Sequence, residues 1–187
     1  MDGIASSVPL IARPSFDRAC SFVPPEYVQA WEWFLREEQR GALWKNLPHR
    51  TRPESPQYSN RLTIDSNPFP VSRDSGIYWP GRGRIKHPGE KTFALSVHNS
   101  NNGPYSDVPP LYLEDGTWVF KYSSQSASVE NWRDQDYNQK MVNCMECGVP
   151  VGVFFATSAG YKVLGLAFVE RYEPENSWFV LHGPVHK

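Results

Sequence analysis

Apolar residues recur at helical spacing near the start of the chain. Proline is favoured in the first turn of a helix, so Pro24 and Pro25 indicate a helix start. Intervals of three and four residues then separate a set of large apolar side chains, namely Tyr27, Val28, Trp31, Phe34 and Leu35. The pattern stops near Gly41. We therefore expect an amphipathic helix over about 25–40, with its aromatic face packed in the core.

A second segment of helical period lies in the C-terminal half. It carries Tyr137, Met141, Cys144 and Met145 and stops before Gly148, which suits a C-terminal cap. Cys144 and Cys147 form a lone C-x-x-C pair in this segment. A zinc site needs further ligands at suitable spacing, and the sequence offers no histidine pair nearby. We interpret both cysteines as structural and expect no metal and no cofactor.

Alternating apolar residues predict strands over 92–97, 116–122, 149–155, 161–172 and 177–181. The expected core of these strands comprises Val151, Val153, Val163, Leu164, Leu166, Phe168 and Val180. A short strand over 62–64 is also possible. Seventeen prolines and 13 glycines favour many turns. The expected fold class is α+β: a twisted, partly closed β-barrel with flanking helices.

Charge is unevenly distributed along the 187 residues, although the net charge is only −1. Residues 40–91 carry ten Lys or Arg against four acidic residues, a balance of about +6. Such asymmetry favours a surface that faces a polyanion, and a solvated basic face without a partner is the alternative. The sequence has no apolar run that spans a membrane, no signal-peptide pattern and an odd number of cysteines. These features predict an intracellular protein without membrane contact.

The stretch 100–124 holds the strongest candidate binding residues. Tyr112 and Tyr122 bracket an acidic turn, Glu114-Asp115-Gly116. Two aromatic rings and a carboxylate within eleven residues are suited to holding a flat ligand with hydrogen-bonding edges, such as a nucleobase. Core packing of the aromatic residues and plain turn chemistry at Asp115 are the alternative interpretation.

Several short motifs in this part of the chain occur in a recognisable order. They read KHP at 86–88, SNNGPYS at 100–106, YLED at 112–115, KYSS at 121–124, DQ at 134–135 and YKV at 161–163. In this order they resemble the SRA (YDG) domain, a module that binds modified cytosine in DNA by flipping the base. The resemblance divides the chain into an N-terminal helical and basic extension, 1–79, and an SRA-like domain, 80–187. The signature tripeptide YDG is absent, and Ser123-Ser124 replaces the family's Thr-Gly.

The resemblance implies a role for each matching residue. Tyr112 and Tyr122 would stack on the flipped base, and Asp115 would accept a hydrogen bond from the cytosine amino group. Ser123 would lie near the 5-substituent, where the smaller side chain leaves room for a hydroxymethyl group. His98 and Asn99 would approach the base and the groove; plain turn chemistry is the alternative for them.

Other residues are candidates for contacts outside the base pocket. Arg82, Arg84 and Lys86 would contact the DNA backbone, since arginine and lysine beside glycines can approach phosphates closely. A flexible surface loop is the alternative for this segment. Arg133 would read a neighbouring guanine in the major groove, and Gln125 or Asn131 would fill the gap left by the base.

The resemblance predicts a reader of double-stranded DNA that carries modified cytosine. Related domains often form the recognition half of modification-dependent restriction enzymes, so a bacterial cytoplasm is expected ahead of a eukaryotic nucleus. We find no nuclease motif or catalytic residues in the sequence and expect any nuclease on a separate domain or subunit. The alternatives are a PUA-like binder of RNA or single strands without modification preference, and an enzyme using Glu114, Asp115 and His98 as acid–base groups.

Overall fold

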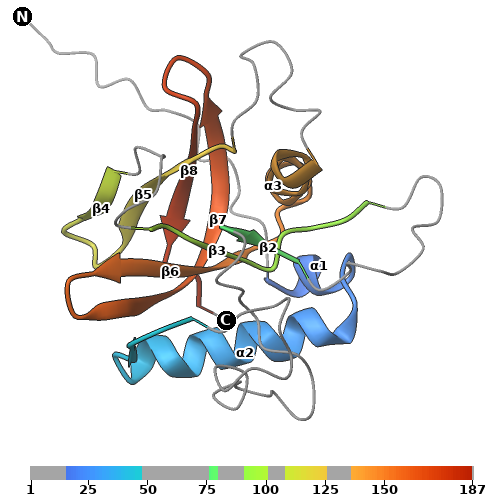
Figure 1. The fold of residues 1–187 in the computed structure, drawn as a ribbon. Helices are drawn as coiled ribbons and strands as arrows, with labels where there is room; N and C mark the ends of the chain where they lie inside the picture. Colours follow the sequence, from blue (N-terminus) through green and yellow to red (C-terminus); the bar gives the residue numbers. More distant parts are fainter. Residues whose placement is uncertain (1–15, 48–75, 80–90, 101–107, 126–135, 187) are drawn as a thin grey trace, which may run out of the picture.

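The structure, a computed structural model, describes residues 16–47, 76–79, 91–100, 108–125 and 136–186 (Figure 1). The helices are α1 (Phe16–Cys20), α2 (Pro25–Gln39) and α3 (Asp136–Cys147). The strands are β1 (Leu43–Trp44), β2 (Ile77–Tyr78), β3 (Ser96–His98), β4 (Val108–Tyr112), β5 (Trp118–Ser123), β6 (Val151–Thr157), β7 (Gly160–Glu173) and β8 (Trp178–Gly183). No helix in these ranges is long and apolar enough to cross a membrane.

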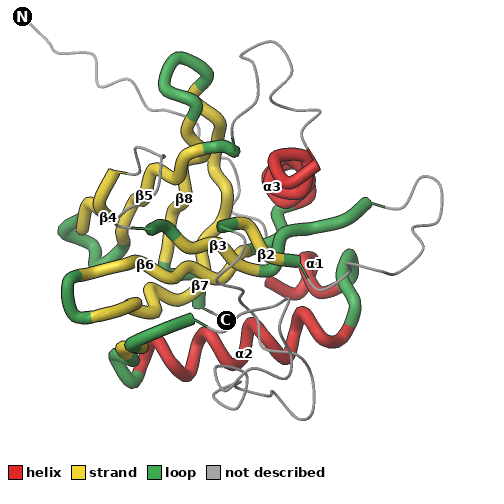
Figure 2. Tube along the Cα trace, viewed as in Figure 1, coloured by secondary structure: helices red, strands yellow, loops and turns green. Residues whose placement is uncertain are grey.

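The strands form one eight-stranded sheet in the order β2-β3-β6-β7-β8-β5-β4, and β1 pairs with β7 (Figure 2). Among the described strands, β3 and β6 pair in parallel, and the other pairs are antiparallel. The long strand β7 pairs with β6 along its first half and with β8 along its second half. This arrangement confirms the α+β class. The sheet is not closed among the described strands, so the expected barrel is not confirmed.

The sheet nevertheless curls so that distant strands face each other. Phe120 of β5 contacts Phe155 of β6 with ring centroids 5.7 Å apart, although β7 and β8 lie between these strands in the sheet. At the edge, Lys162 of β7 donates a hydrogen bond from Nζ to the Tyr112 hydroxyl of β4 over 3.3 Å. The curl is consistent with the twist of antiparallel sheets and gives the sheet a concave inner face.

Helix α2 lies against β6 and β7 and comes unusually close to them (Figure 1). A Cβ atom built on Gly152 of β6 would overlap the Phe34 ring, and one on Gly165 of β7 would meet the Glu38 side chain at 3.0 Å. Phe34 and Glu38 are four residues apart and therefore share one face of the helix. Gly165 pairs with Val153, the neighbour of Gly152, so the two glycines form one platform beneath α2.

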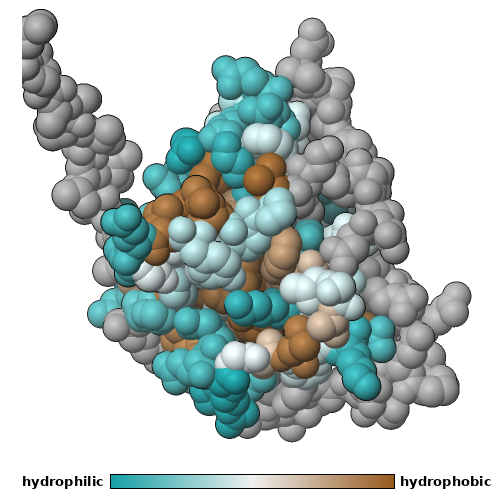
Figure 3. Space-filling model, turned by 90° about the vertical axis from the view of Figure 1, so that its left-hand side faces the viewer, coloured by the Kyte–Doolittle hydropathy of each residue, from teal (hydrophilic) through white to brown (hydrophobic). Residues whose placement is uncertain are grey.

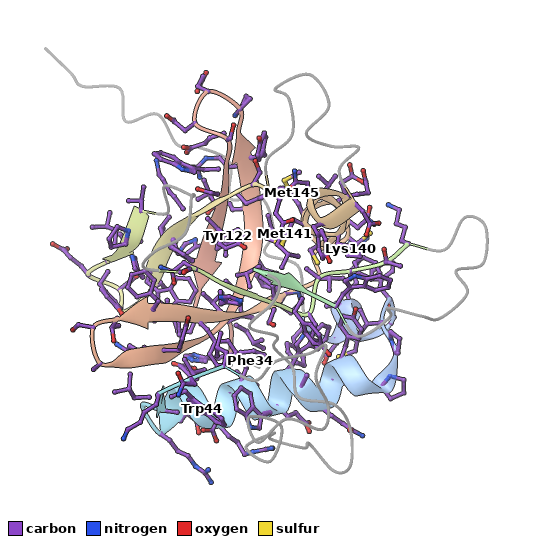
Figure 4. The ribbon with its side chains drawn as sticks, in the orientation of Figure 1. Phe34, Trp44, Tyr122, Lys140, Met141 and Met145 are labelled. Carbon is purple, nitrogen blue, oxygen red and sulfur yellow. The ribbon has the colours of Figure 1, made fainter. Side chains whose placement is uncertain are left out.

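This contact places the N-terminal segment inside the main core. Trp31 and Phe34 of α2 are fully buried in the same cluster as Phe154 of β6 and Leu166 of β7. Figure 4 shows Phe34 directed from α2 toward the sheet. Strand β2, which also precedes residue 80, extends the sheet beside β3. Elements on both sides of the predicted domain boundary thus share one hydrophobic core.

Both predicted helices are confirmed, and glycines end them as expected. Gly41 has φ 62°, its amide donates to the Glu38 carbonyl over 2.9 Å, and the Ala42 amide donates to the Glu37 carbonyl over 3.0 Å. Gly148, with φ 64°, follows α3 in the same way. Positive φ costs little for glycine, which explains why both helices stop at these residues.

The strands predicted over 116–122, 149–155, 161–172 and 177–181 are confirmed as β5, β6, β7 and β8. All the predicted core residues of the last three strands are buried except Phe168, which is half-buried. The strand predicted over 92–97 is shorter, because β3 begins at Ser96. Helix side chains bind the preceding carbonyls instead: Asn143 donates to Thr92, and the Tyr27 hydroxyl donates to Phe93. The strand predicted over 62–64 lies outside the described residues.

The glycine platform predicts a steep penalty for an added methyl group. Gly152→Ala should lower the free energy of unfolding by about 3 kcal/mol or more, because Phe34 must be displaced from a packed core. The control is Gly41→Ala, which has open space around it and should cost only about 1 kcal/mol for its positive φ. Urea denaturation measures both values. Equal penalties for the two variants would contradict the close helix–sheet contact.

The buried cysteine predicts selective chemical labelling. Burial raises the pKa of the Cys144 thiol far above its usual range, so the thiol stays protonated and inert. Cys20 and Cys147 are only half-buried. Alkylation of the folded protein at pH 8, followed by mass spectrometry, should therefore modify Cys147 and Cys20 but leave Cys144 intact until the protein unfolds. Labelling of all three thiols at similar rates would show that α3 is not packed as described.

Candidate nucleic-acid interface

Strands β4 and β5 form a hairpin whose tip carries the acidic turn. The Gly116 amide donates to the Leu113 carbonyl over 3.1 Å, and the Leu113 amide donates to the Thr117 carbonyl over 2.8 Å. Gly116 has φ 83°. This pattern is a three-residue loop, in which a turn over Glu114 and Asp115 is followed by a left-handed glycine. The sequence Glu-Asp-Gly therefore fixes Asp115 at an exposed hairpin tip.

A chain of polar contacts runs from Asp115 to the neighbouring strands. Asp115 Oδ1 accepts hydrogen bonds from the Thr117 amide (2.9 Å) and from the Thr117 hydroxyl (2.6 Å). The same hydroxyl lies 3.0 Å from His182 Nε2 of β8. His182 Nδ1 in turn lies 3.4 Å from Glu170 Oε2 of β7. The carboxylate of the turn is thus connected to the body of the sheet.

Tyr112 ends β4, the edge strand of the sheet, and is 57% exposed. The Lys162 ammonium lies 5.5 Å from the centroid of its ring. Leu111 and Leu113, on either side of Tyr112, are also exposed. Figure 3 views the side of the molecule on which β4 lies and shows apolar residues, in brown, among hydrophilic ones. Tyr112 is therefore accessible to a ligand from solvent.

Tyr122, by contrast, is only 4% exposed and lies inside the curl of the sheet (Figure 4). It shares the inner face of β5 with Trp118 and Phe120, and its ring contacts Phe120 edge-on at 6.1 Å. Gly76, beside β2, covers its hydroxyl: a Cβ built on Gly76 would lie 2.5 Å from Tyr122 Oη. The inner face is therefore closed over Tyr122 in this structure.

The hairpin places the two predicted stacking residues at different points along its length. Tyr112 pairs with Trp118, and Tyr122 lies four residues further along β5, about 13 Å of strand. Tyr112 is exposed, whereas Tyr122 is buried. Their joint role in stacking stays a prediction.

The backbone of His98 lies close to the same Gly76 position as the Tyr122 hydroxyl. The His98 amide donates to the Gly76 carbonyl over 2.9 Å, and the Cβ position of Gly76 lies 3.4 Å from the His98 carbonyl oxygen. The His98 ring is 7% exposed and contacts Tyr161 edge-on at 6.0 Å. A residue of β3 and a residue of β5 thus come together across the concave face, although the strands are not neighbours in the sheet.

The other predicted polar residues lie at the ends of these two strands. Asn99 follows β3 and accepts a hydrogen bond from the Ala156 amide at its Oδ1 over 2.7 Å. Ser123 ends β5 and is buried. The hydroxyl of Ser124, the next residue, lies 3.3 Å from the Tyr172 hydroxyl. Buried polar side chains therefore gather beside Tyr122, in a region where apolar residues are the usual occupants.

The predicted groove and backbone contacts are described only in part. Gln125 is anchored, because its amide donates to Asn138 Oδ1 over 2.8 Å and its carbonyl accepts from Asn138 Nδ2 over 3.0 Å. The predicted roles of Arg82, Arg84, Lys86 and Arg133 fall outside the described residues.

Several cations in the described ranges are paired with carboxylates. Lys121 and Arg171 both bind Glu173, and the hydrogen bond from Lys121, followed by that from Arg171, holds the pKa of Glu173 below its usual value. Lys91 contacts Glu146 at 3.6 Å. These pairs reduce the positive charge that the described surface can offer to phosphates.

Lys140 is a feature that the sequence analysis missed. It is fully buried, lies 2.6 Å from Asp136 Oδ2, and places its ammonium 4.2 Å from the Trp79 ring centroid. Lys140 lies one turn after Tyr137, on the apolar face of α3. This position in the sequence could have indicated that the Lys140 side chain is buried. The Thr117–His182 contact was also missed, because the two residues are 65 positions apart.

The described residues contain no group of three or more His, Cys, Asp or Glu that could hold a metal ion. What the interface offers is an exposed tyrosine, a braced carboxylate, and a buried tyrosine among polar groups. These groups are able to stack on a flat ring and to accept or donate hydrogen bonds at its edge.

No protein-family model and no curated protein matches the chain. Among solved structures, it is similar to the SRA domain of SUVH5, which was crystallised in complex with hemimethylated CG DNA. The identity is 22%, the match covers 60% of this chain and 72% of the other, and the TM-score is 0.38. A likeness of this size does not assign the chain to a family.

The contact between Tyr122 and Gly76 predicts an energetic coupling. Gly76→Ala should destabilise the protein by about 1–3 kcal/mol, because its new methyl group meets the Tyr122 hydroxyl. In a Tyr122→Phe background the same substitution should cost clearly less, since the nearest ring carbon lies 3.8 Å away. A double-mutant cycle by urea denaturation measures the difference. Additive effects would place Gly76 away from the ring.

Proposed function

We propose that the chain is a DNA-binding module that recognises a modified cytosine, of the 5-methyl or 5-hydroxymethyl type, flipped out of the duplex. One observation carries the proposal: the Tyr122 hydroxyl and the His98 backbone carbonyl both lie against Gly76 on the concave face, although their strands are not neighbours in the sheet. The order of the motifs along the chain supports the same function independently.

The chemistry of these residues suits an extruded base. The Tyr122 ring would replace part of the stacking that the base loses, which is worth about 1–3 kcal/mol per base. Ser123 and His98 would offer hydrogen-bonding groups in a buried setting, where such bonds are stronger than in water. Asp115 would accept from the exocyclic amino group, which is a donor in cytosine.

Because Gly76 lies against the Tyr122 hydroxyl, we propose that it moves when a base stacks on the ring. Gly76 precedes β2, which has two residues and lies at the end of the described sheet, beside β3. Opening such a short edge strand breaks few backbone hydrogen bonds. The proposal therefore includes a displacement of this edge strand when DNA binds.

Phosphate contacts would come largely from the basic segment. Since Lys91, Lys121 and Arg171 contact carboxylates, we propose Arg82, Arg84, Lys86 and Arg133 as the main cations for DNA. The SRA resemblance further supports a place in a modification-dependent restriction system, with the nuclease on another domain or subunit.

A binding titration at fixed moderate salt tests the proposal. One short duplex would carry cytosine, 5-methylcytosine or 5-hydroxymethylcytosine at a single position, and salt is fixed because phosphate contacts dominate affinity. The wild type should bind one modified duplex at least about tenfold tighter, or about 1.4 kcal/mol. Tyr122→Ala should remove this preference but keep the weaker binding to unmodified DNA.

Tyr27→Ala is the matched control, because Tyr27 of α2 is as buried as Tyr122, 5% against 4% exposed, and lies outside the proposed site. It should keep the preference for modified DNA. Equal binding of all duplexes by the wild type would refute the proposal. If single-stranded RNA then bound more tightly than any duplex, the PUA-like alternative would replace it.

A further inference from the structure

We propose that Thr117 and His182, braced by Glu170, position the Asp115 carboxylate and thereby determine whether the protein distinguishes 5-methylcytosine from thymine. The inference rests on the proposed function, in which Asp115 contacts the flipped base. It assigns a positioning role to two residues outside the motifs of the resemblance. Thymine is the relevant competitor, because it carries the same 5-methyl group and differs at position 4.

The hydrogen-bond directions follow from the chemistry of each group. An ionised carboxylate only accepts, so the Thr117 hydroxyl must give its single proton to Asp115 Oδ1, 2.6 Å away. The hydroxyl oxygen is then left as an acceptor for His182 Nε2, 3.0 Å away. His182 therefore carries a proton on Nε2, and the chain of donors runs from the imidazole through the hydroxyl to the carboxylate.

The far end of the chain is fixed by charge. His182 Nδ1 faces Glu170 Oε2 at 3.4 Å, and Glu170 Oε1 lies 3.7 Å from Arg171 Nη1. Glu170, Arg171 and, through Thr117, Asp115 are the charged groups around the imidazole. The imidazolium donates from both ring nitrogens, to Thr117 and to Glu170, whereas the neutral Nε2–H form keeps only the donor that Thr117 needs.

Strand register holds these groups in place. His182 of β8 pairs with Val119 of β5 and with Phe168 of β7. Thr117 is two residues before Val119 and therefore lies diagonally across from His182 on the same face. Glu170 lies in a bulge of β7 between Val169 and Arg171, from which its carboxylate reaches His182 Nδ1. This is the outer face of β5, opposite Tyr122. The brace therefore acts on the turn without entering the proposed base pocket.

The consequence is a carboxylate with a fixed plane. Two hydrogen bonds to Oδ1, from the Thr117 amide and hydroxyl, restrict rotation of the Asp115 side chain at an exposed hairpin tip. A fixed acceptor favours the 4-amino group of cytosine, which is a donor, and opposes the 4-oxo group of thymine, which is an acceptor. A mobile carboxylate could turn away from thymine and would discriminate less.

The test compares two duplexes that differ in one base: 5-methylcytosine opposite guanine, and thymine opposite guanine. The two bases differ in the 4-substituent and in the proton that thymine carries on N3. The affinity ratio of the two duplexes is measured at fixed salt for the wild type and four variants. Thr117→Val removes the hydroxyl and keeps the branched shape, whereas Thr117→Ser keeps the hydroxyl. His182→Leu removes the donor, whereas His182→Gln supplies an amide donor.

Thr117→Val and His182→Leu should lower the ratio about tenfold, within the range of one well-placed base contact. Thr117→Ser and His182→Gln should restore most of it. Binding to unmodified DNA should stay unchanged in all four variants, because the phosphate contacts are untouched. A merely structural role would weaken both duplexes alike and leave the ratio as in the wild type.

A measurement without DNA tests the positioning role of His182 separately from the proposed DNA-binding function. The nitrogen-15 signals of His182 should report the Nε2–H form in the wild type and Thr117→Ser. If the wild type prefers 5-methylcytosine but Thr117→Val and His182→Leu keep its ratio, the positioning role is refuted and the proposed function stands. If the wild type shows no preference for a modified duplex, the proposed function fails and this inference fails with it, whichever form His182 adopts.

Discussion

The close seating of α2 on the sheet is the contact on which the rest of the structure depends. The helix approaches so closely because Gly152 and Gly165 have no side chain beneath Phe34 and Glu38. Burying the Phe34 ring contributes about 1.5–3 kcal/mol to the free energy of unfolding. The ring can be buried there because no side chain lies beneath it at Gly152. The helix therefore fixes where β6 and β7 lie. Through β7, this part of the sheet continues into β8 and β5, which the twist of the sheet carries around to the other side.

That curl decides which candidate residues meet. On the concave side, the Tyr122 hydroxyl and the His98 carbonyl both lie against Gly76, in a setting that is buried and polar at once. On the convex side, the chain from Glu170 to Asp115 braces the hairpin tip. The same strand β5 contributes to both because its side chains alternate between the faces. Recognition at the base edge and stacking on the base face would thus be served by opposite sides of one strand.

The sequence predicts the elements whose signals are local. The two long helices follow from apolar period and terminal glycines, and β5 to β8 follow from alternation. The short β3 is a different case, because side chains of α2 and α3, distant in sequence, bind the carbonyls before it. The separation of Tyr112 from Tyr122 depends on the pairing of Tyr112 with Trp118, which a period of two does not fix. The brace on Asp115 likewise needs two residues 65 positions apart to become neighbours.

The most direct test of the central claim is whether the modified base leaves the helix when the protein binds. A duplex with 2-aminopurine beside the modified cytosine reports this, since its fluorescence is quenched by stacking and rises when a neighbouring base is extruded. If the base is flipped, the fluorescence should rise at saturating wild-type protein. The rise should be much smaller for the duplex with plain cytosine and absent for Tyr122→Ala. Saturated binding of the modified duplex without any change in fluorescence would contradict base flipping.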